Sequence, residues 1–157
     1  LIEDLHRDII WLQASSSLPL LSRTVEIEGQ EYLDGGISDS IPVKEAMRLG
    51  CEKVVIVLTQ CAEYRKKPNE VMPLIRVKYR RYPKLIEQMA TRHLHYNETL
   101  EEIKTLKAQG KVFVIQPQKP VAIGRLEKDR SELHALYRAG VEDGAAQAKA
   151  LREFMKR

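Results

Sequence analysis

Apolar residues recur along the N-terminal half of the chain with first a helical and then a two-residue period. Residues 1–12 carry apolar side chains at helical spacing, and the three serines and the proline of residues 14–19 predict a loop after that helix. Apolar and polar positions then alternate over residues 24–28 and 31–33, with a turn predicted at Gly29 and the residue after it. This part of the chain therefore predicts a helix, a loop and a β-hairpin.

The stretch after the hairpin predicts a helix and a buried strand. Pro42 is expected in the first turn of the helix, Ser40 or Asp39 as its N-cap, and Gly50 as its stop. Residues 53–59 are continuously apolar apart from their ends, which is typical of a strand in a parallel sheet covered on both faces. The order strand, helix, strand predicts an α/β layer fold.

The second half of the chain predicts more helices and one strand. Residues 68–82 give no clear period, but residues 85–107 keep apolar side chains on one helical stripe, and residues 112–115 form a second buried-type strand. Asp129 has the spacing of a capping residue for a helix that ends before Gly140. A last, alanine-rich helix is expected to reach the end of the chain.

Length and composition favour one soluble domain. The chain has 157 residues, of which 43% are hydrophobic and 31% charged. Its longest apolar run, residues 54–58, is far shorter than the roughly 20 residues that span a bilayer. Cys51 and Cys61 flank the predicted strand, too far apart for a disulfide. Two free thiols lead us to expect a reducing, cytoplasmic location.

Positive charge is concentrated in the middle of the chain. Residues 62–92 contain nine Lys or Arg, the last of them Arg92, against three Glu, whereas the whole chain has a net charge of +4. Such a segment fits an anionic surface such as lipid headgroups, or it is an ordinary solvated helical face. Tyr79 and Tyr82 are sparse aromatic residues and no recognition motif is present, so we expect no nucleic-acid binding.

Asp34, at the end of the predicted hairpin, is the main candidate for chemistry. Gly35 and Gly36 follow it, which permits positive φ and lets a neighbouring group approach the carboxylate closely. On local pattern alone, Asp34 is a turn-former, a general base or a metal ligand. His93 lies on the helical stripe and is interpreted as a hydrogen-bonded core residue rather than a ligand.

Four features follow one another over about residues 10–60: the serine-rich loop, the hairpin, the run Tyr32 to Val43 around the Asp-Gly-Gly motif, and the apolar strand. Their order and spacing resemble those of the patatin-like phospholipases. The resemblance implies an α/β fold, a three-layer α/β/α sandwich of patatin type with helical additions. Residues 1–60 would be the C-terminal part of the catalytic domain. Residues 61–157 would add the basic segment, one strand and the closing helices to the same domain.

The resemblance also implies the chemistry of a bacterial serine acyl hydrolase. Asp34 matches the aspartate of a Ser-Asp dyad that cleaves lipid or other carboxylic esters, and no cofactor or metal is implied. The family's GxSxG serine and glycine-rich oxyanion loop precede this aspartate, and neither occurs in the 157 residues. We therefore expect a piece of a longer enzyme, inactive alone, whose uncovered sheet edges favour oligomers. The rival hypothesis is a non-catalytic α/β module that binds an anionic partner or a membrane surface.

Overall fold

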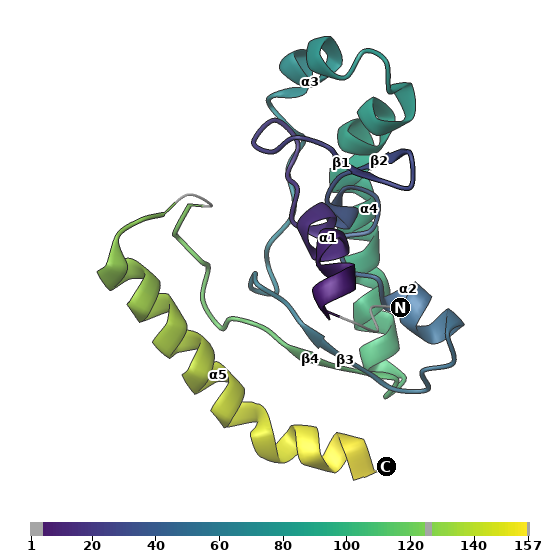
Figure 1. The fold of residues 1–157 in the computed structure, drawn as a ribbon. Coiled ribbons are helices and arrows are strands. Elements are labelled where there is room, and N and C mark those ends of the chain that lie inside the picture. The colour runs from purple at the N-terminus through teal and green to yellow at the C-terminus, as the bar shows by residue number, and fades with distance from the viewer. Residues whose placement is uncertain (1–4, 125–126, 157) are drawn as a thin grey trace. The chain divides into compact units, whose positions relative to one another are not determined.

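The computed structural model of this protein describes residues 5–124 and 127–156, and it shows a mixed α/β arrangement of short sheets and several helices (Figure 1). The elements follow in the order α1 (Leu5–Ser15), β1 (Val25–Ile27), β2 (Gln30–Tyr32), η1 (Gly35–Ile37), α2 (Val43–Arg48), β3 (Val54–Val57), α3 (Met72–Lys78), α4 (Pro83–Ala108), β4 (Val112–Ile115) and α5 (Arg130–Lys156). The mixed α/β class predicted from the sequence is confirmed. The described strands form two two-stranded sheets, and a three-layer sandwich is not confirmed.

The chain forms two compact units that alternate along the sequence. Unit 1 runs up to Ile41 and resumes over Lys66–Glu98, and unit 2 comprises Pro42–Arg65 and Thr99–Arg157. Helix α4 therefore contributes its first part to unit 1 and its last part to unit 2. The domain boundary near residue 60 stays a prediction.

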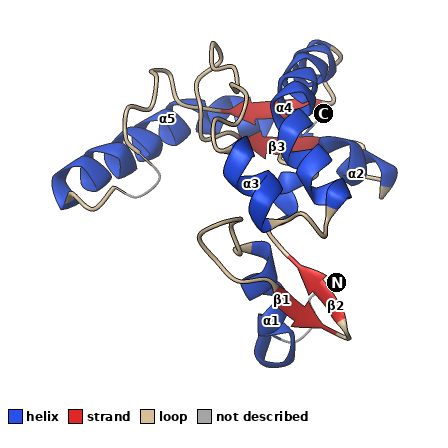
Figure 2. Cartoon of the chain, turned by 90° about the horizontal axis from the view of Figure 1, so that it is seen from above, coloured by secondary structure: helices blue, strands red, loops and turns tan. Residues whose placement is uncertain are grey.

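In unit 1 the predicted hairpin is present. Strands β1 and β2 pair antiparallel, with Val25 opposite Tyr32 (Figure 2). Its turn lies at Glu28 and Gly29, both with positive φ (52° and 73°), one residue earlier than the predicted turn. Val25 is buried against Ala14 of α1 because alternate strand residues point to one face.

A second apolar cluster in unit 1 joins α3 and α4 to the last residue of η1. Ile75 of α3 is fully buried (0% exposed), and it packs with Tyr79, Met89 of α4 and Ile37 of η1. The Tyr79 hydroxyl accepts a hydrogen bond from the Leu20 backbone N–H at 3.1 Å. Helix α3 lies within residues 68–82, where the apolar residues show no clear period.

Unit 2 is built on a parallel pair of strands. Residues 54–57 of β3 pair in register with residues 112–115 of β4. Ile56 is buried, but Val57 is 70% exposed. The prediction of a strand covered on both faces is therefore wrong for β3, because in the described part of the chain it pairs with β4 alone and nothing covers the Val57 side chain.

The N-terminus of α2 differs from its predicted capping. The N-cap residue is Pro42, and it makes no side-chain capping bond. The Ser40 hydroxyl instead donates to the Gly36 carbonyl at 2.7 Å, and the Asp39 carboxylate accepts from the Ile41 N–H at 3.2 Å. Both predicted caps therefore stabilise the turn before the helix rather than the helix itself.

Helix α5 is capped as predicted but is longer than predicted. Asp129 Oδ1 accepts hydrogen bonds from the N–H and the hydroxyl of Ser131 at 2.7 and 2.6 Å, and these bonds lower the pKa of the Asp129 carboxyl. The two helices expected on either side of Gly140 form one helix of 27 residues. An internal glycine costs only about 1 kcal/mol relative to alanine, which does not end a helix of this length. Phe154 of α5 lies 5.6 Å, centroid to centroid, from Phe113 of β4.

The structure also bears on two expectations from composition. Cys51 is exposed and Cys61 is buried, and both are free thiols, as predicted. None of the helices in residues 5–124 and 127–156 combines the length and the apolar character needed to cross a membrane.

Candidate active site

Asp34 follows β2 and is held by its own backbone. It is the N-cap of the short 3-10 helix η1, with φ −47° and ψ 122°. Its N–H donates to the Ser17 carbonyl at 2.9 Å. Ser17 is itself buried, and its hydroxyl donates to the Gln13 carbonyl at 2.8 Å. The serine-rich loop therefore holds Asp34 through a backbone hydrogen bond, and the Ser17 hydroxyl is not directed at the aspartate.

The carboxylate of Asp34 is partly buried and shapes the turn. Its Oδ1 accepts a hydrogen bond from the Gly36 N–H at 2.7 Å. This is the turn-forming role that the local pattern allowed, and it engages one of the two carboxylate oxygens. The chemistry of Asp34 therefore depends on the second oxygen, Oδ2.

The space around Gly36 is tight, whereas its backbone angles do not call for glycine. Neither Gly35 nor Gly36 has positive φ, so the conformational freedom predicted for them is not used. A Cβ on Gly36 would lie 3.0 Å from Asp34 Oδ1 and 3.5 Å from Arg92 Nη2, whereas a Cβ on Gly35 would meet nothing within 4 Å. A side chain at position 36 would therefore crowd the carboxylate, and the predicted approach of a neighbouring group to that carboxylate stays a prediction.

Arg92 of α4 clamps the same turn from the other side. Its Nε donates to the Gly36 carbonyl at 2.7 Å, and its Nε and Nη2 lie 3.3 and 3.2 Å from the Ser40 hydroxyl oxygen. From the sequence, Arg92 was predicted only as one residue of the basic segment. The available signal was its position three residues after buried Met89, on the side of α4 that faces the core.

A hydrogen bond between exposed residues joins the start of α4 to β2, the strand that leads to Asp34. The Tyr82 hydroxyl donates to the Glu31 carboxylate, which also accepts from Thr24 at 2.9 Å. The bond from Tyr82, and secondarily that from Thr24, lowers the pKa of the Glu31 carboxyl. The same carboxylate raises the pKa of the Tyr82 hydroxyl. Helix α4 is therefore tied both to β2 and to the Asp34 turn.

The described residues do not supply further ligands for a metal ion at Asp34. His93 is partly buried rather than fully in the core, and its Nδ1 atom is enclosed without a hydrogen-bond partner among the described residues, which corrects the predicted hydrogen bond. In residues 5–124 and 127–156, no group of three or more His, Cys, Asp or Glu could hold a metal ion. A metal at Asp34 thus lacks a ligand set in this part of the chain.

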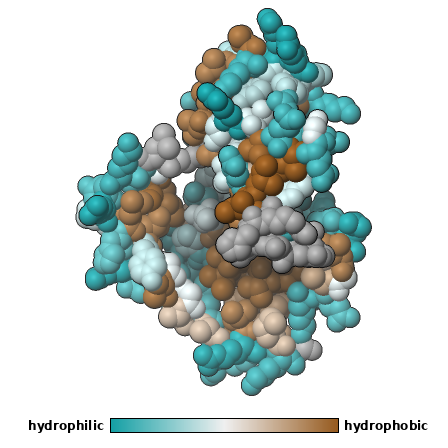
Figure 3. Space-filling model, viewed as in Figure 1, coloured by the Kyte–Doolittle hydropathy of each residue, from teal (hydrophilic) through white to brown (hydrophobic). Residues whose placement is uncertain are grey.

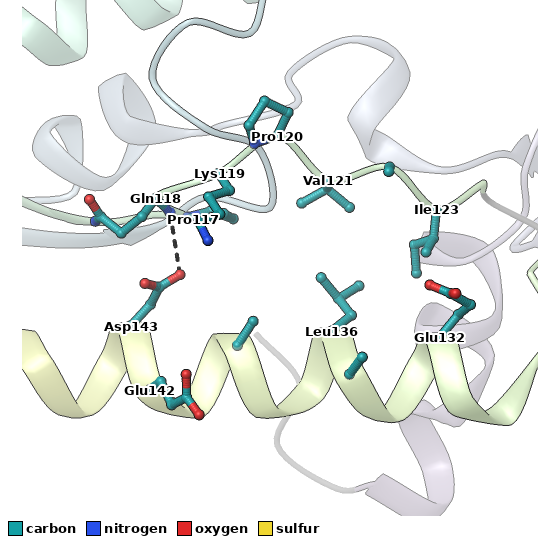
Figure 4. Close-up of a pocket in the computed structure, with 13 residues that line it drawn as sticks. Pro117, Gln118, Lys119, Pro120, Val121, Ile123, Glu132, Leu136, Glu142 and Asp143 are labelled. Atoms are coloured by element: carbon teal, nitrogen blue, oxygen red, sulfur yellow. Dashed lines mark hydrogen bonds between the residues drawn. The ribbon is translucent and has the colours of Figure 1, made fainter.

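The described surface also has an open groove, which belongs to unit 2 and not to the unit of Asp34 (Figure 4). It has a volume of about 340 Å³ and lies between residues 117–123 and α5. Val121, Ile123 and Leu136 face into it in Figure 4, and the Gln118 N–H donates to Asp143 at 3.3 Å across its end. The described residues that line it include no serine, threonine or cysteine, so they offer no hydroxyl or thiol nucleophile for acyl transfer.

Comparisons with known proteins agree with part of the resemblance seen in the sequence. The model of the family "Patatin-like phospholipase" matches residues 7–47, which include Asp34 and both glycines. The model of a domain of unknown function, DUF6363, matches residues 82–156. The uncharacterized protein YjjU of Escherichia coli K12 is 32% identical over 112 residues, which cover 70% of this chain and 31% of that protein. The chain thus spans less than a third of the length of that relative. No solved structure is similar enough to count as a match.

These matches connect the chain to the patatin-like phospholipases over a short part of its length, and they indicate a relationship to lipid hydrolases. The Asp34 turn lies in the patatin match, and Arg92 lies in the DUF6363 match. The contact between Arg92 and Gly36 therefore joins the two matched regions inside unit 1.

Proposed function

We propose that this chain is the aspartate-bearing, C-terminal part of a patatin-like lipid acyl hydrolase, a carboxylic ester hydrolase with phospholipids or related esters as substrates. Asp34 is the general base of its Ser-Asp dyad, and the serine belongs to residues that precede this chain. The observation that carries the proposal is the Asp34 turn, which lies in the patatin match and is held by the serine-rich loop, by β2 and by Arg92 of α4.

The geometry of the turn suits a base that must point in one direction. The bond from Gly36 N–H to Oδ1 orients the carboxylate, which leaves Oδ2 as the acceptor for a serine proton. In the proposed reaction that proton moves to Asp34 as the serine oxygen attacks the ester carbonyl, and it then passes to the leaving alcohol. Water repeats the cycle on the acyl-enzyme. Because a carboxylate is a weak base for a hydroxyl, stabilisation of the oxyanion by the missing glycine-rich loop must contribute much of the rate.

The proposed fold of the complete protein is the three-layer α/β/α sandwich. Its support is the state of β3 and β4, a parallel pair with an exposed Val57. Parallel sheets are normally covered on both faces, so a two-stranded parallel sheet with an open face is an incomplete one. The short share of the E. coli relative that the chain spans is consistent with further strands elsewhere in the protein.

The first prediction concerns the 157 residues alone. Without a GxSxG serine and an oxyanion loop, the purified chain should hydrolyse a p-nitrophenyl ester no faster than the buffer blank. The full-length protein serves as the positive control. Turnover by the chain that disappears on replacing Ser15, Ser16, Ser17, Ser38 or Ser40 by alanine would contradict the assignment of the nucleophile to preceding residues.

The second prediction concerns Arg92 as a positioning residue. Arg92→Ala in the full-length protein should lower kcat by about tenfold or more and leave KM nearly unchanged, because a base displaced by about 1 Å loses its alignment with the serine. Arg92→Lys should recover only part of kcat, since lysine keeps the charge but not the fork that reaches both Gly36 and Ser40. The matched control is Arg138→Ala on the exposed side of α5. A variant with normal kcat but lower thermal stability would show that Arg92 is merely structural.

The second candidate function is the non-catalytic module. The observation that favours it is the same Gly36–Asp34 hydrogen bond, because a turn-forming aspartate needs no further role. In that case Asp34 can be replaced by asparagine, which also accepts a hydrogen bond, without any loss of function.

A further inference from the structure

Helix α3, its N-cap Val71 and the segment after it present exposed apolar and basic side chains together. Val77 is 73% exposed, Leu74 is 56% exposed and Val71 is 49% exposed. Basic side chains, all exposed, lie among and just after them, and no Asp or Glu occurs between Val71 and Ile86. We call these residues the α3 patch: Val71, Leu74, Arg76, Val77, Lys78, Arg80, Arg81 and Lys84. Figure 3 shows apolar and hydrophilic atoms side by side over α3, at the top of the view.

The exposure of this patch is not due to a poorly packed helix. The opposite face of α3 carries Ile75 and Tyr79, which are 0% and 5% exposed and belong to the cluster that contains Ile37 and Met89. Helix α3 is therefore fixed by its inner face, and its outer apolar residues remain in water because nothing in the described part of unit 1 covers them. Exposed apolar side chains grouped in this way indicate an interaction surface.

We propose that the α3 patch docks the protein on a bilayer surface that contains anionic lipids. Two properties of the patch together select this partner. The arginines and lysines are attracted to a negatively charged membrane surface, and valine and leucine side chains enter the boundary between headgroups and acyl chains. The basic side chains could also bind the phosphates of a nucleic acid, but a phosphate backbone has no apolar surface for Leu74 and Val77 to contact. A purely apolar protein partner would not need the five cations of the patch.

Docking through α3 would bring unit 1, which also contains the Asp34 turn, to the lipid surface, and this use of the patch rests on the proposed function. Ile37, which packs against Ile75 of α3, lies three residues after Asp34. The patch and the turn are thus attached to one packed cluster in unit 1. Membrane binding itself does not depend on the proposed chemistry, so each can be tested without the other.

The test is a flotation assay of the purified full-length protein with neutral phosphatidylcholine vesicles and with vesicles that contain about 30% phosphatidylglycerol. The protein should bind the anionic vesicles roughly tenfold or more strongly, and added salt should weaken the binding. Arg80→Glu with Arg81→Glu should abolish this preference. The matched control, Arg138→Glu with Lys149→Glu on α5, changes the net charge equally and should bind as the wild type does.

A second pair of variants tests the apolar part of the patch. Leu74→Ser with Val77→Ser should weaken binding to anionic vesicles, because less apolar surface enters the interface. Leu94→Ser with Val141→Ser, at positions that are 50% and 53% exposed on α4 and α5, should not. All four side chains are exposed, so each variant should retain the circular dichroism of the wild type.

Three results would overturn the proposal. The first is equal binding to neutral and anionic vesicles. The second is an equal loss of binding in the α3 variants and their α5 controls, which would place the contact elsewhere. The third is that the wild-type protein binds a short DNA duplex but does not bind vesicles, which would make the patch a nucleic-acid surface. Absence of esterase activity in a protein that still binds vesicles through α3 would refute the proposed function and leave this inference standing.

Discussion

Asp34→Asn in the full-length protein is expected to lower kcat for ester hydrolysis by about 100-fold or more, because loss of a positioned general base typically costs 10²- to 10⁴-fold. Asparagine has nearly the same shape as aspartate and its amide oxygen can still accept the Gly36 N–H bond. The substitution therefore removes the base while the turn remains. The measurement is the initial rate with a short-chain p-nitrophenyl ester over a range of concentrations.

The matched control for this experiment is Asp39→Asn. Asp39 lies five residues further on, is exposed, and also accepts a backbone hydrogen bond, from Ile41. It should retain the wild-type kcat. Wild-type turnover by Asp34→Asn would end the proposal of a Ser-Asp dyad and would favour the non-catalytic module, in which Asp34 only forms a turn.

The largest effect on stability is expected at Ile75, because its side chain is completely buried. Ile75→Ala removes three carbon atoms from the cluster of Tyr79, Met89 and Ile37, and it should lower the free energy of unfolding of unit 1 by about 2–5 kcal/mol. The cost combines the lost transfer of apolar surface with the cavity that remains. Trp11, the one tryptophan of the chain, lies in unit 1 with its ring 5.2 Å from that of Tyr32, so its fluorescence during urea unfolding reports on this unit.

The neighbouring residue provides the control for Ile75. Leu74 has a side chain of the same size but is 56% exposed, and Leu74→Ala should change the stability by no more than about 0.5 kcal/mol. Equal losses for the two variants would mean that the inner and outer faces of α3 are not those described above. That result would also remove the structural basis of the α3 patch.

Much of the secondary structure could be predicted from the sequence. The hairpin around Gly29, the long helix α4 and the strands β3 and β4 all follow from periodicity and turn residues, which act over a few positions. The continuity of α5 through Gly140 could not be predicted from the sequence, because glycine both ends helices and occurs within them. Local signals of this kind identify elements better than they identify where elements end.

The candidate site was predicted only in part, for a similar physical reason. Asp34, Gly35 and Gly36 are consecutive, so a short motif could reveal them. Arg92 contacts Gly36 from 56 positions away, and a contact between distant residues leaves no local pattern. The basic segment was also visible in the sequence, but which of its charges lie beside exposed apolar side chains became clear only when Ile75 and Tyr79 were found to be buried.

The sequence by itself determined the mixed α/β class, the position of Asp34 at the end of a hairpin, and the concentration of positive charge in residues 62–92. These features depend on residues that are close together in the chain, so local sequence patterns reveal them. Only the tertiary structure decided that the Asp34 turn is held by Ser17 and Arg92, that a Cβ at Gly36 would crowd the Asp34 carboxylate, and that α3 has a buried face and an open one. Burial and hydrogen bonding between distant segments are properties of the folded packing, because they exist only once the chain has brought those segments together.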